Sequence, residues 1–177
     1  MWLFLILINE KQFLKRPDII TQKIYQLPQL MTRVSEWKFF GRSFVFTNGV
    51  FDILHPGHIF SLSEAAKEAD FLVVGLNSDD SVKRLKGHQR PVNSQDSRAL
   101  LLASLLMVDV VVIFEQDTPL ELINTLKPDV LAKGGDYTIE QIVGAKEVIA
   151  NGGRVVINPV VEGHSTTNII DKLKNAL

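Results

Sequence analysis

The stretch Asn48-Gly49-Val50-Phe51-Asp52-Ile53-Leu54-His55-Pro56-Gly57-His58 joins a strand-like run of residues to the start of a helix. Residues 43–47 before it read as a buried strand, and residues 59–69 after it carry apolar side chains at helical spacing. His55 and His58 are therefore expected at a helix N-terminus, where backbone N–H groups and the helix dipole attract anions. Two imidazoles three residues apart can donate to one group. The stretch predicts a phosphate-binding turn.

Two glycines support this interpretation. Gly49 and Gly57 place no side chain between the backbone and a ligand, so a polyphosphate can approach closely. Two other interpretations stay open for H-x-G-H alone. The motif is short enough to be a turn with two incidental histidines, and histidines also bind metals, although the chain has no cysteine and no obvious third ligand.

Composition limits the fold and the partners. With 177 residues, of which 46% are hydrophobic, the chain is expected to form one domain, residues 41–177, preceded by an extension, residues 1–40. A net charge of −1 gives no basic field for nucleic acid, so a small molecule is the expected partner. The absence of cysteine excludes disulfides and thiolate catalysis, and a cytoplasmic location is the simplest expectation.

The N-terminal run Trp2 to Ile8 is apolar but much shorter than the roughly 20 residues that span a bilayer. No membrane span is expected. The run also lacks the basic leader and small-residue cleavage site of a secretory signal, so it is predicted to pack on the core or on a partner subunit. Translation from Met31 instead of Met1 is the alternative.

Strand-like and helix-like segments alternate along the rest of the chain. Strands are expected at 71–76, 110–114, 130–132 and 154–158, and helices at 97–107, 119–126, 140–150 and 166–177. This alternation predicts right-handed crossovers and a Rossmann-like α/β fold, with a parallel sheet covered by helices on both faces. Neither G-x-G-x-x-G nor a P-loop occurs, so the histidine motif takes their position after the first strand.

A cluster of cations follows the second predicted strand. Residues 83–87 are expected to form a basic loop, in which Lys86 is the strongest candidate to bind a phosphate, with Arg90 and Arg98 close behind. A solvated basic loop is the alternative. Asp79, directly after that strand, is predicted to accept hydrogen bonds from a sugar hydroxyl or to help hold magnesium, or else to cap the next turn.

Two later segments have the same position relative to the sheet. Lys133-Gly134-Gly135-Asp136 follows the fourth strand, so Lys133 and Asp136 are candidates to contact phosphate and sugar or base, with a plain Gly-Gly turn as the alternative. Ser165 and Thr166 open the last predicted helix, where Ser165 is a good N-cap. A second helix N-terminus there can hold a polyphosphate from the side opposite the histidines, leaving the α-phosphorus open to in-line attack.

Taken in order, these motifs resemble those of the cytidylyltransferase-like nucleotidyltransferases. Within that superfamily the chain is most similar to the D-glycero-β-D-manno-heptose 1-phosphate adenylyltransferases, from about residue 19 to the C-terminus. The motifs are N-G-V-F-D-x-L-H-x-G-H, N-S-D, R-L-K-G, R-P-V-N, K-G-G-D-Y and G-x-S-T-T-N-I-I. Val50 departs from the cysteine common in this family, and Val160 stands where related glycerol 3-phosphate cytidylyltransferases have arginine.

The resemblance implies transfer of AMP from ATP to a heptose 1-phosphate, giving ADP-heptose and pyrophosphate for the lipopolysaccharide core. It implies direct attack without a covalent enzyme intermediate, Mg²⁺ held mainly by phosphates with Asp52 as a candidate ligand, a homodimer, and a separate sugar kinase. A cytidylyltransferase acting on glycerol 3-phosphate or another phosphorylated alcohol is the first alternative. A non-catalytic nucleotide sensor is the second.

The resemblance also implies roles for individual residues. The expected catalytic residues are His55, His58 and Lys86, and the expected substrate-binding residues are Asp79, Arg90 and Arg98. The expected nucleotide-binding residues are Asn48, Gly49, Phe51, Asp52, Gly57, Lys133, Gly134, Asp136, Ser165 and Thr166.

Overall fold

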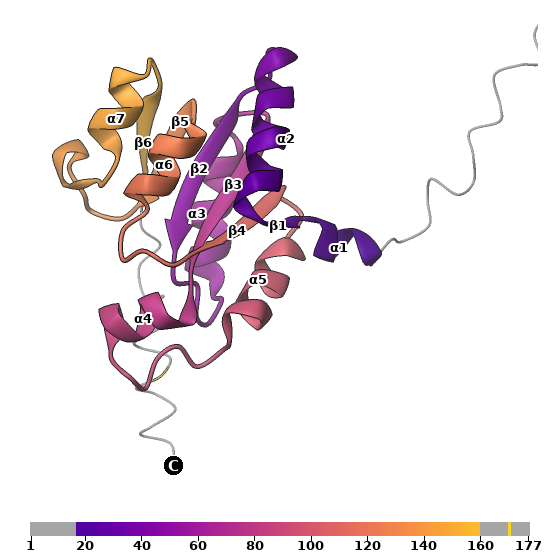
Figure 1. Ribbon diagram of the computed structural model, residues 1–177. Helices are drawn as coiled ribbons and strands as arrows, with labels where there is room; N and C mark the ends of the chain where they lie inside the picture. The colour runs from indigo at the N-terminus through magenta and orange to yellow at the C-terminus, as the bar shows by residue number, and fades with distance from the viewer. Residues whose placement is uncertain (1–16, 160–169, 171–177) are drawn as a thin grey trace, which may run out of the picture.

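The computed structural model describes residues 17–159 and residue 170. Its centre is a six-stranded parallel sheet in the order β1-β4-β3-β2-β5-β6 (Figure 1). The strands are β1 (Ile24–Tyr25), β2 (Phe44–Gly49), β3 (Phe71–Asn77), β4 (Val110–Phe114), β5 (Val130–Gly134) and β6 (Arg154–Asn158). The predicted Rossmann-like α/β fold is confirmed.

Helices cover both faces of the sheet. They are α1 (Asp18–Gln22), α2 (Leu27–Phe39), α3 (Pro56–Ala66), α4 (Asp79–Lys86), α5 (Gln95–Ala103), α6 (Leu120–Leu126) and α7 (Ala145–Ala150), with a 3₁₀ turn at Ile139–Gln141. Buried side chains of α2, α6 and α7 form one core cluster with the sheet, and those of α3 and α5 form the other. The two apolar layers thus lie on opposite faces, as the helices in Figure 1 show.

The central strand β2 contributes to both cores. Phe44 and Phe46 belong to the cluster that includes α2, and Val45 belongs to the cluster that includes α3, because successive strand residues point to opposite faces. Phe46 pairs with Val73 on one side and with Leu131 on the other. A strand buried on both faces is a continuous apolar run, which is how this segment reads in the sequence.

The order of the strands creates a crevice at the carboxyl edge of the sheet. The chain runs from β2 to β3 on one side, whereas β5 pairs with β2 on the other side. The loops after β2 and β5 therefore leave the sheet next to each other and then diverge. In open parallel sheets a ligand binds at such a switch point.

Residues 24–39, predicted to lie in an N-terminal extension, take part in the same fold. β1 pairs with β4, and α2 buries Leu30, Val34 and Trp37 against the sheet. Trp37 stacks on Phe71 of β3 with the ring centroids 4.2 Å apart. The predicted boundary at residue 40 thus separates α2 from the sheet against which α2 packs.

Two predicted elements differ from the structure. Residues 83–87 form the last turn of α4 and its cap, not a loop, because Ser78 accepts a hydrogen bond from the backbone N–H of Ser81 and starts a helix there. The helix predicted at 140–150 is interrupted. Gly144 has a φ of +87°, and a Cβ there would lie 2.5 Å from the side chain of Ile123, so α7 begins only at Ala145.

The other boundaries agree or shift by a few residues. The predicted strands at 110–114 and 154–158 are confirmed as β4 and β6, and α5 begins two residues before the predicted helix. Trp2 to Ile8 and the predicted helix at 166–177 lie outside the described residues, apart from residue 170.

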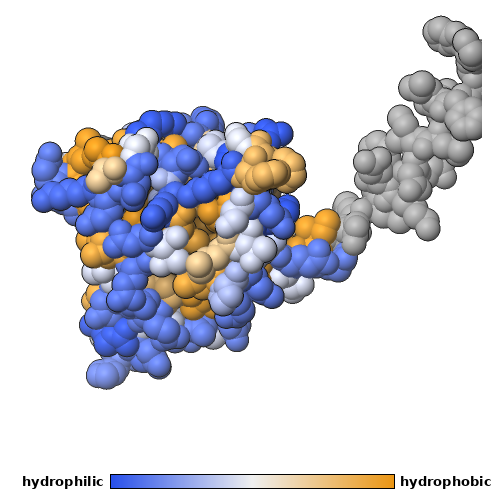
Figure 2. Space-filling model, turned by 45° about the horizontal axis from the view of Figure 1, so that its top comes forward, coloured by the Kyte–Doolittle hydropathy of each residue, from blue (hydrophilic) through white to orange (hydrophobic). Residues whose placement is uncertain are grey.

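The surface of the described residues is mostly hydrophilic, with separate hydrophobic patches (Figure 2). The most exposed large apolar side chains include Phe39 and Phe40 at the end of α2 and Leu106 after α5. Within residues 17–159 and 170, no helix combines the length and the apolar character needed to cross a membrane.

Candidate active site

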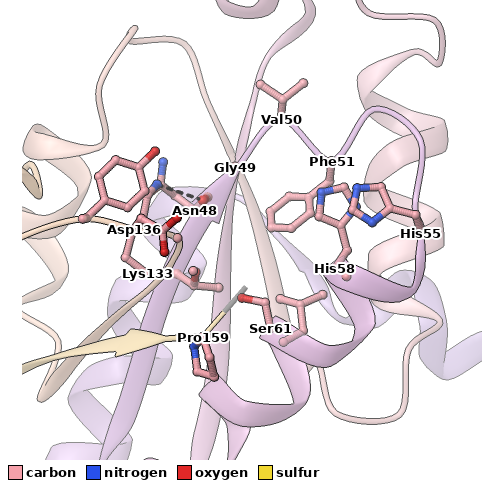
Figure 3. Close-up of a pocket in the computed structure, with 16 residues that line it drawn as sticks. Asn48, Gly49, Val50, Phe51, His55, His58, Ser61, Lys133, Asp136 and Pro159 are labelled. Carbon is pink, nitrogen blue, oxygen red and sulfur yellow. Dashed lines mark hydrogen bonds between the residues drawn. The ribbon is translucent and has the colours of Figure 1, made fainter. Parts of the chain in front are cut away.

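A cavity of about 620 Å³ occupies the crevice at the carboxyl edge of β2 and β5. Figure 3 shows its two walls: the loop after β2 and the first turn of α3 carry the histidines on one side, and the ends of β2 and β5 face them. Nine residues predicted to bind or act at the site line this cavity: Asn48, Gly49, Phe51, His55, Gly57, His58, Lys133, Gly134 and Asp136. Segments more than 70 residues apart in the chain are thus brought together, as predicted from their positions after parallel strands of one sheet.

His55 and His58 lie at the beginning of α3, as expected. His55 is the N-cap residue with an extended backbone, Pro56 takes the first helical position, and His58 follows in the first turn. The two imidazole rings stack with centroids 3.8 Å apart, and the ring of Phe51 meets His58 edge-on at 5.1 Å. The stack points two imidazoles at one part of the cavity, beside the positive end of the helix dipole.

The environment of His58 keeps its imidazole neutral. The pKa of His58 is lowered to about 4, mainly by burial and also by repulsion from His55, while a backbone hydrogen bond with Ile53 acts against both. Near pH 7 the ring therefore carries one proton and donates one hydrogen bond without a net charge. A bound polyphosphate would place several negative charges next to it and favour the imidazolium form.

This environment leads to the first prediction, the titration of His58. In the protein without nucleotide, NMR of a ¹³C-labelled histidine sample should show His58 remaining neutral until the pH approaches 4. Adding ATP should raise the midpoint, because an anion stabilises the charged imidazole. Resonance assignment comes from the His58→Asn variant, which should lose one signal. A midpoint that does not move with ATP would contradict the placement of phosphate beside this ring.

The loop between β2 and α3 has a strained backbone. Phe51 adopts a left-handed conformation with φ +46°, a rare state for a residue with a bulky side chain. This conformation folds the Phe51 ring back over Gly49, where a Cβ would lie 2.9 Å from the ring. Gly49 is therefore needed for the ring to reach His58, in addition to leaving space for a ligand.

The opposite wall carries Lys133 at the end of β5. The ammonium nitrogen of Lys133 donates to Asn48 Oδ1 at 3.3 Å and to the Asn48 carbonyl at 3.5 Å. Burial lowers the pKa of Lys133 below that of an exposed lysine. The next residue, Gly134, packs against α3, because a Cβ there would lie 2.7 Å from the hydroxyl of Ser61. The wall thus combines a largely buried cation with close packing between the strand and α3.

Asp52 does not fit the role of a nucleotide or magnesium ligand. Its carboxylate is fully buried and accepts hydrogen bonds from Arg90 Nε at 2.6 Å and from the backbone N–H groups of Val92 at 2.8 Å and Asn93 at 3.0 Å. Although burial alone would raise it, the pKa of Asp52 is lowered, because Asn93, Val92 and Arg90 stabilise the carboxylate. Arg90 correspondingly lies against Asp52 and is absent from the cavity lining, so its predicted contact with substrate stays a prediction.

Arg98 also differs from its predicted role. Its side chain has no exposed surface, which corrects the expectation that it contacts substrate. The guanidinium donates to the carbonyls of Val50 at 2.6 Å, Asn77 at 2.9 Å and Asn93 at 3.1 Å, and to Asp79 Oδ1 at 2.8 Å. Asp79 is thereby held by Arg98 and lies outside the cavity lining, while the cap of α4 is Ser78. Arg98 thus links the residue that follows β2 to the last residue of β3.

Lys86 lies exposed in the last turn of α4 and is absent from the cavity lining. Its predicted contact with phosphate therefore stays a prediction, which the variant Lys86→Ala tests. If Lys86 reaches the phosphates during turnover, kcat should fall by about tenfold or more, since hydrogen bonds to charged groups contribute about 1.5–3 kcal/mol. Steady-state kinetics with Lys83→Ala as the control measures this. An unchanged kcat would assign Lys86 to the solvated surface.

Ser165 and Thr166 lie outside the described residues.

The structure adds lining residues to which the sequence analysis assigned no role in binding or catalysis, although Val50, Gly135 and Tyr137 lie within its motifs. They are Thr47, Val50, Ser61, Leu62, Gly135, Tyr137 and Pro159. Ser61 could have been found, because it follows His58 by three residues and so shares its helix face. The position of Tyr137 depends on Gly135, which has a φ of +134°. A Cβ on residue 135 would lie 2.6 Å from the ring of Tyr137, so only glycine leaves room for the ring there.

Comparisons with known proteins show several relatives of this chain. The Bifunctional protein HldE of Paramagnetospirillum magneticum is 59% identical over 140 residues, which make up 79% of this chain and 29% of that protein. The protein of the same name from Gluconobacter oxydans is 49% identical over 156 residues, or 88% of this chain and 33% of the relative. The chain thus spans about a third of the length of these curated relatives.

Solved structures share the fold. The lipopolysaccharide core biosynthesis protein from Thermoplasma volcanium is 31% identical, with a TM-score of 0.56, over 70% of this chain and 100% of that one. Pantoate-beta-alanine ligase from Francisella tularensis has a TM-score of 0.57 over 85% of this chain and 76% of the ligase; at 17% identity it shows a common fold alone. A family model described as Cytidylyltransferase-like matches residues 46–172, which contain both walls of the cavity. The chain therefore belongs to the cytidylyltransferase-like family.

Proposed function

We propose that the protein transfers AMP from ATP to D-glycero-β-D-manno-heptose 1-phosphate, giving ADP-heptose and pyrophosphate. The observation that carries the proposal is the stacked pair His55 and His58 at the N-terminus of α3, facing Lys133 across a cavity of about 620 Å³. Such a cavity has room for a nucleotide. The name of the Thermoplasma volcanium relative supports a place in lipopolysaccharide core biosynthesis.

The reaction is a direct displacement at phosphorus. An oxygen of the acceptor phosphate attacks the α-phosphorus of ATP and forms the new P–O bond. The bond from the α-phosphorus to the oxygen bridging to the β-phosphorus breaks, and pyrophosphate leaves with that electron pair. Negative charge grows on the α-phosphate oxygens and on the leaving group. Imidazole N–H donors and the backbone N–H groups of the first turn of α3 are placed to stabilise this charge.

Magnesium enters this proposal as the ion bound to the substrate ATP. Both oxygens of Asp52 are engaged by Arg90 and two backbone N–H groups, so its carboxylate does not fit the role of a metal ligand. Within residues 17–159 and 170, no three side chains of the ligating types converge on one point. The phosphate oxygens of ATP, which Mg²⁺ prefers as ligands, would carry the ion into the site.

The test is pyrophosphate release from the purified protein with Mg²⁺, in all pairings of ATP or CTP with heptose 1-phosphate or glycerol 3-phosphate. Release with ATP and heptose 1-phosphate alone is the expected result. Release that requires CTP would move the activity to the cytidylyltransferase alternative. Binding of ATP without release in any pairing would favour a nucleotide sensor.

The remaining expectations belong to the same proposal. The homodimer, the separate sugar kinase and the cytoplasmic location all derive from the resemblance and from composition. Light scattering on the purified protein tests the dimer, which should give twice the chain mass of 19.8 kDa.

A further inference from the structure

Lys133 is a cation without an anionic partner in the part of the chain described. No carboxylate within residues 17–159 and 170 forms an ion pair with it, although it is largely buried. Its partners are two oxygens of Asn48 at 3.3 and 3.5 Å, which are neutral and at the long end of hydrogen-bond distances. Removing an ammonium group from water without a counter-charge costs free energy. An anion that binds at this wall recovers that cost.

Asn48 adds a second donor to the same place. Its Oδ1 accepts a hydrogen bond from Lys133, and its Nδ2 group donates to no acceptor within residues 17–159 and 170. Both residues line the cavity, Asn48 from the end of β2 and Lys133 from the end of β5. An ammonium and an amide N–H₂ together match an oxyanion with several acceptor oxygens, such as a phosphate monoester.

The position of this pair relative to the histidines distinguishes two phosphates. In Figure 3, Lys133 and Asn48 lie on one wall, and His55 and His58 lie on the other, with Gly49 between them. An in-line displacement needs the attacking oxygen and the leaving oxygen on opposite sides of the phosphorus. If the histidine wall holds the leaving pyrophosphate, an acceptor phosphate bound by Lys133 on the other wall (Figure 3) would lie on the opposite side of the α-phosphorus.

We infer that Lys133 and Asn48 form the subsite for the phosphate group of the acceptor, so that Lys133 determines the use of a phosphorylated acceptor and not the affinity for ATP. This inference rests on the proposed function for the direction of attack. It moves Lys133 from the nucleotide, where the resemblance places it, to the phosphate of the acceptor. The subsite would neutralise the nucleophile's dianion and so reduce its repulsion from the phosphates of ATP.

The variant Lys133→Met tests the inference, because methionine keeps the length and apolar character of the side chain without its charge. The KM for heptose 1-phosphate should rise about 10- to 100-fold, the effect of losing one charged hydrogen bond. The Kd for ATP, measured by calorimetry without acceptor, should stay within about twofold of the wild type. The variant Lys133→Arg should recover much of the acceptor KM, whereas Lys67→Met, with the same charge change at the distal end of α3, should leave both constants unchanged.

Opposite shifts would overturn the inference. A rise in the Kd for ATP without a rise in the acceptor KM would place Lys133 on the nucleotide. Equal changes in both constants with a lowered melting temperature would give it a structural role only.

A second readout separates this inference from the proposed function. Inorganic phosphate is titrated by calorimetry into the complex with α,β-methylene-ATP, which cannot transfer AMP. The wild type should bind phosphate at least fivefold more tightly than Lys133→Met, whichever acceptor the enzyme uses. If the wild type shows no turnover but this difference persists, the proposed function fails and the anion subsite stands. Equal phosphate binding by the two proteins would overturn the subsite.

Discussion

Replacing His58 by alanine is expected to lower kcat about 10²- to 10³-fold, the usual cost of removing a donor that stabilises charge in the transition state. His58 lies in the first turn of α3, stacked on His55 and neutral near pH 7, so its N–H can strengthen its bond to phosphate as charge develops there. The Kd for ATP should change much less than kcat, because the bond matters most in the transition state. Steady-state pyrophosphate release and calorimetry measure the two quantities.

The control for this prediction is His88→Ala. His88 is exposed beyond the end of α4, and its replacement removes an imidazole without touching the cavity. The variant should keep a wild-type kcat. A His58→Ala variant that turns over like the wild type would contradict the role given to the histidine pair. A matching loss of ATP binding and of kcat would assign His58 to ground-state binding instead.

Replacing Arg98 by methionine is expected to lower the free energy of unfolding by about 3–5 kcal/mol, the effect of breaking a buried, hydrogen-bonded charge pair. The guanidinium satisfies the carbonyls of Val50, Asn77 and Asn93 and the carboxylate of Asp79, and none of its surface is exposed. Methionine fills part of the volume but leaves these acceptors without their donor. Urea unfolding followed by circular dichroism measures the change.

A surface arginine provides the comparison. Arg84→Met removes an ion pair with Asp117 in which both side chains are about half exposed, so it should cost less than about 1 kcal/mol. Arg98→Lys should recover little, because one ammonium cannot reach four acceptors arranged around a planar guanidinium. A stability of Arg98→Met within 1 kcal/mol of the wild type would show that the loop after β2 does not depend on this network.

The histidine motif was predictable because its signals are local. The strand at residues 44–49, the proline at the first helical position and the spacing of His55 and His58 all lie within one short stretch of the sequence. Alternation of strands and helices also predicted the parallel sheet, since a buried strand must be apolar on both faces. The strand β4 was placed at its observed ends for the same reason, whereas the edge strand β6, which is only partly buried, was marked by its short apolar run after Asn151-Gly152-Gly153.

The cations after β3 were harder to place, because their partners are distant in sequence. Arg90 and Arg98 look like other basic residues near a phosphate site until the fold shows Asp52 lying 38 positions before Arg90 and the carbonyl of Val50 lying 48 positions before Arg98. A buried arginine with four acceptors and an exposed one have the same letter in the sequence. Only the packing distinguishes a residue that holds the loop from one that touches the ligand.

The sequence by itself determined the fold class, the turn that places His55 and His58 at the start of α3, and the family, because periodicity, helix-start residues and motif order are properties of neighbouring residues. The tertiary structure decided which charges face the cavity. It buried Arg98, tied Asp52 to Arg90, and left Lys133 beside Asn48 without an anionic partner among the described residues. These outcomes depend on the competition between desolvation and hydrogen bonding at contacts formed only when distant segments meet, which is why spacing along the chain does not reveal them.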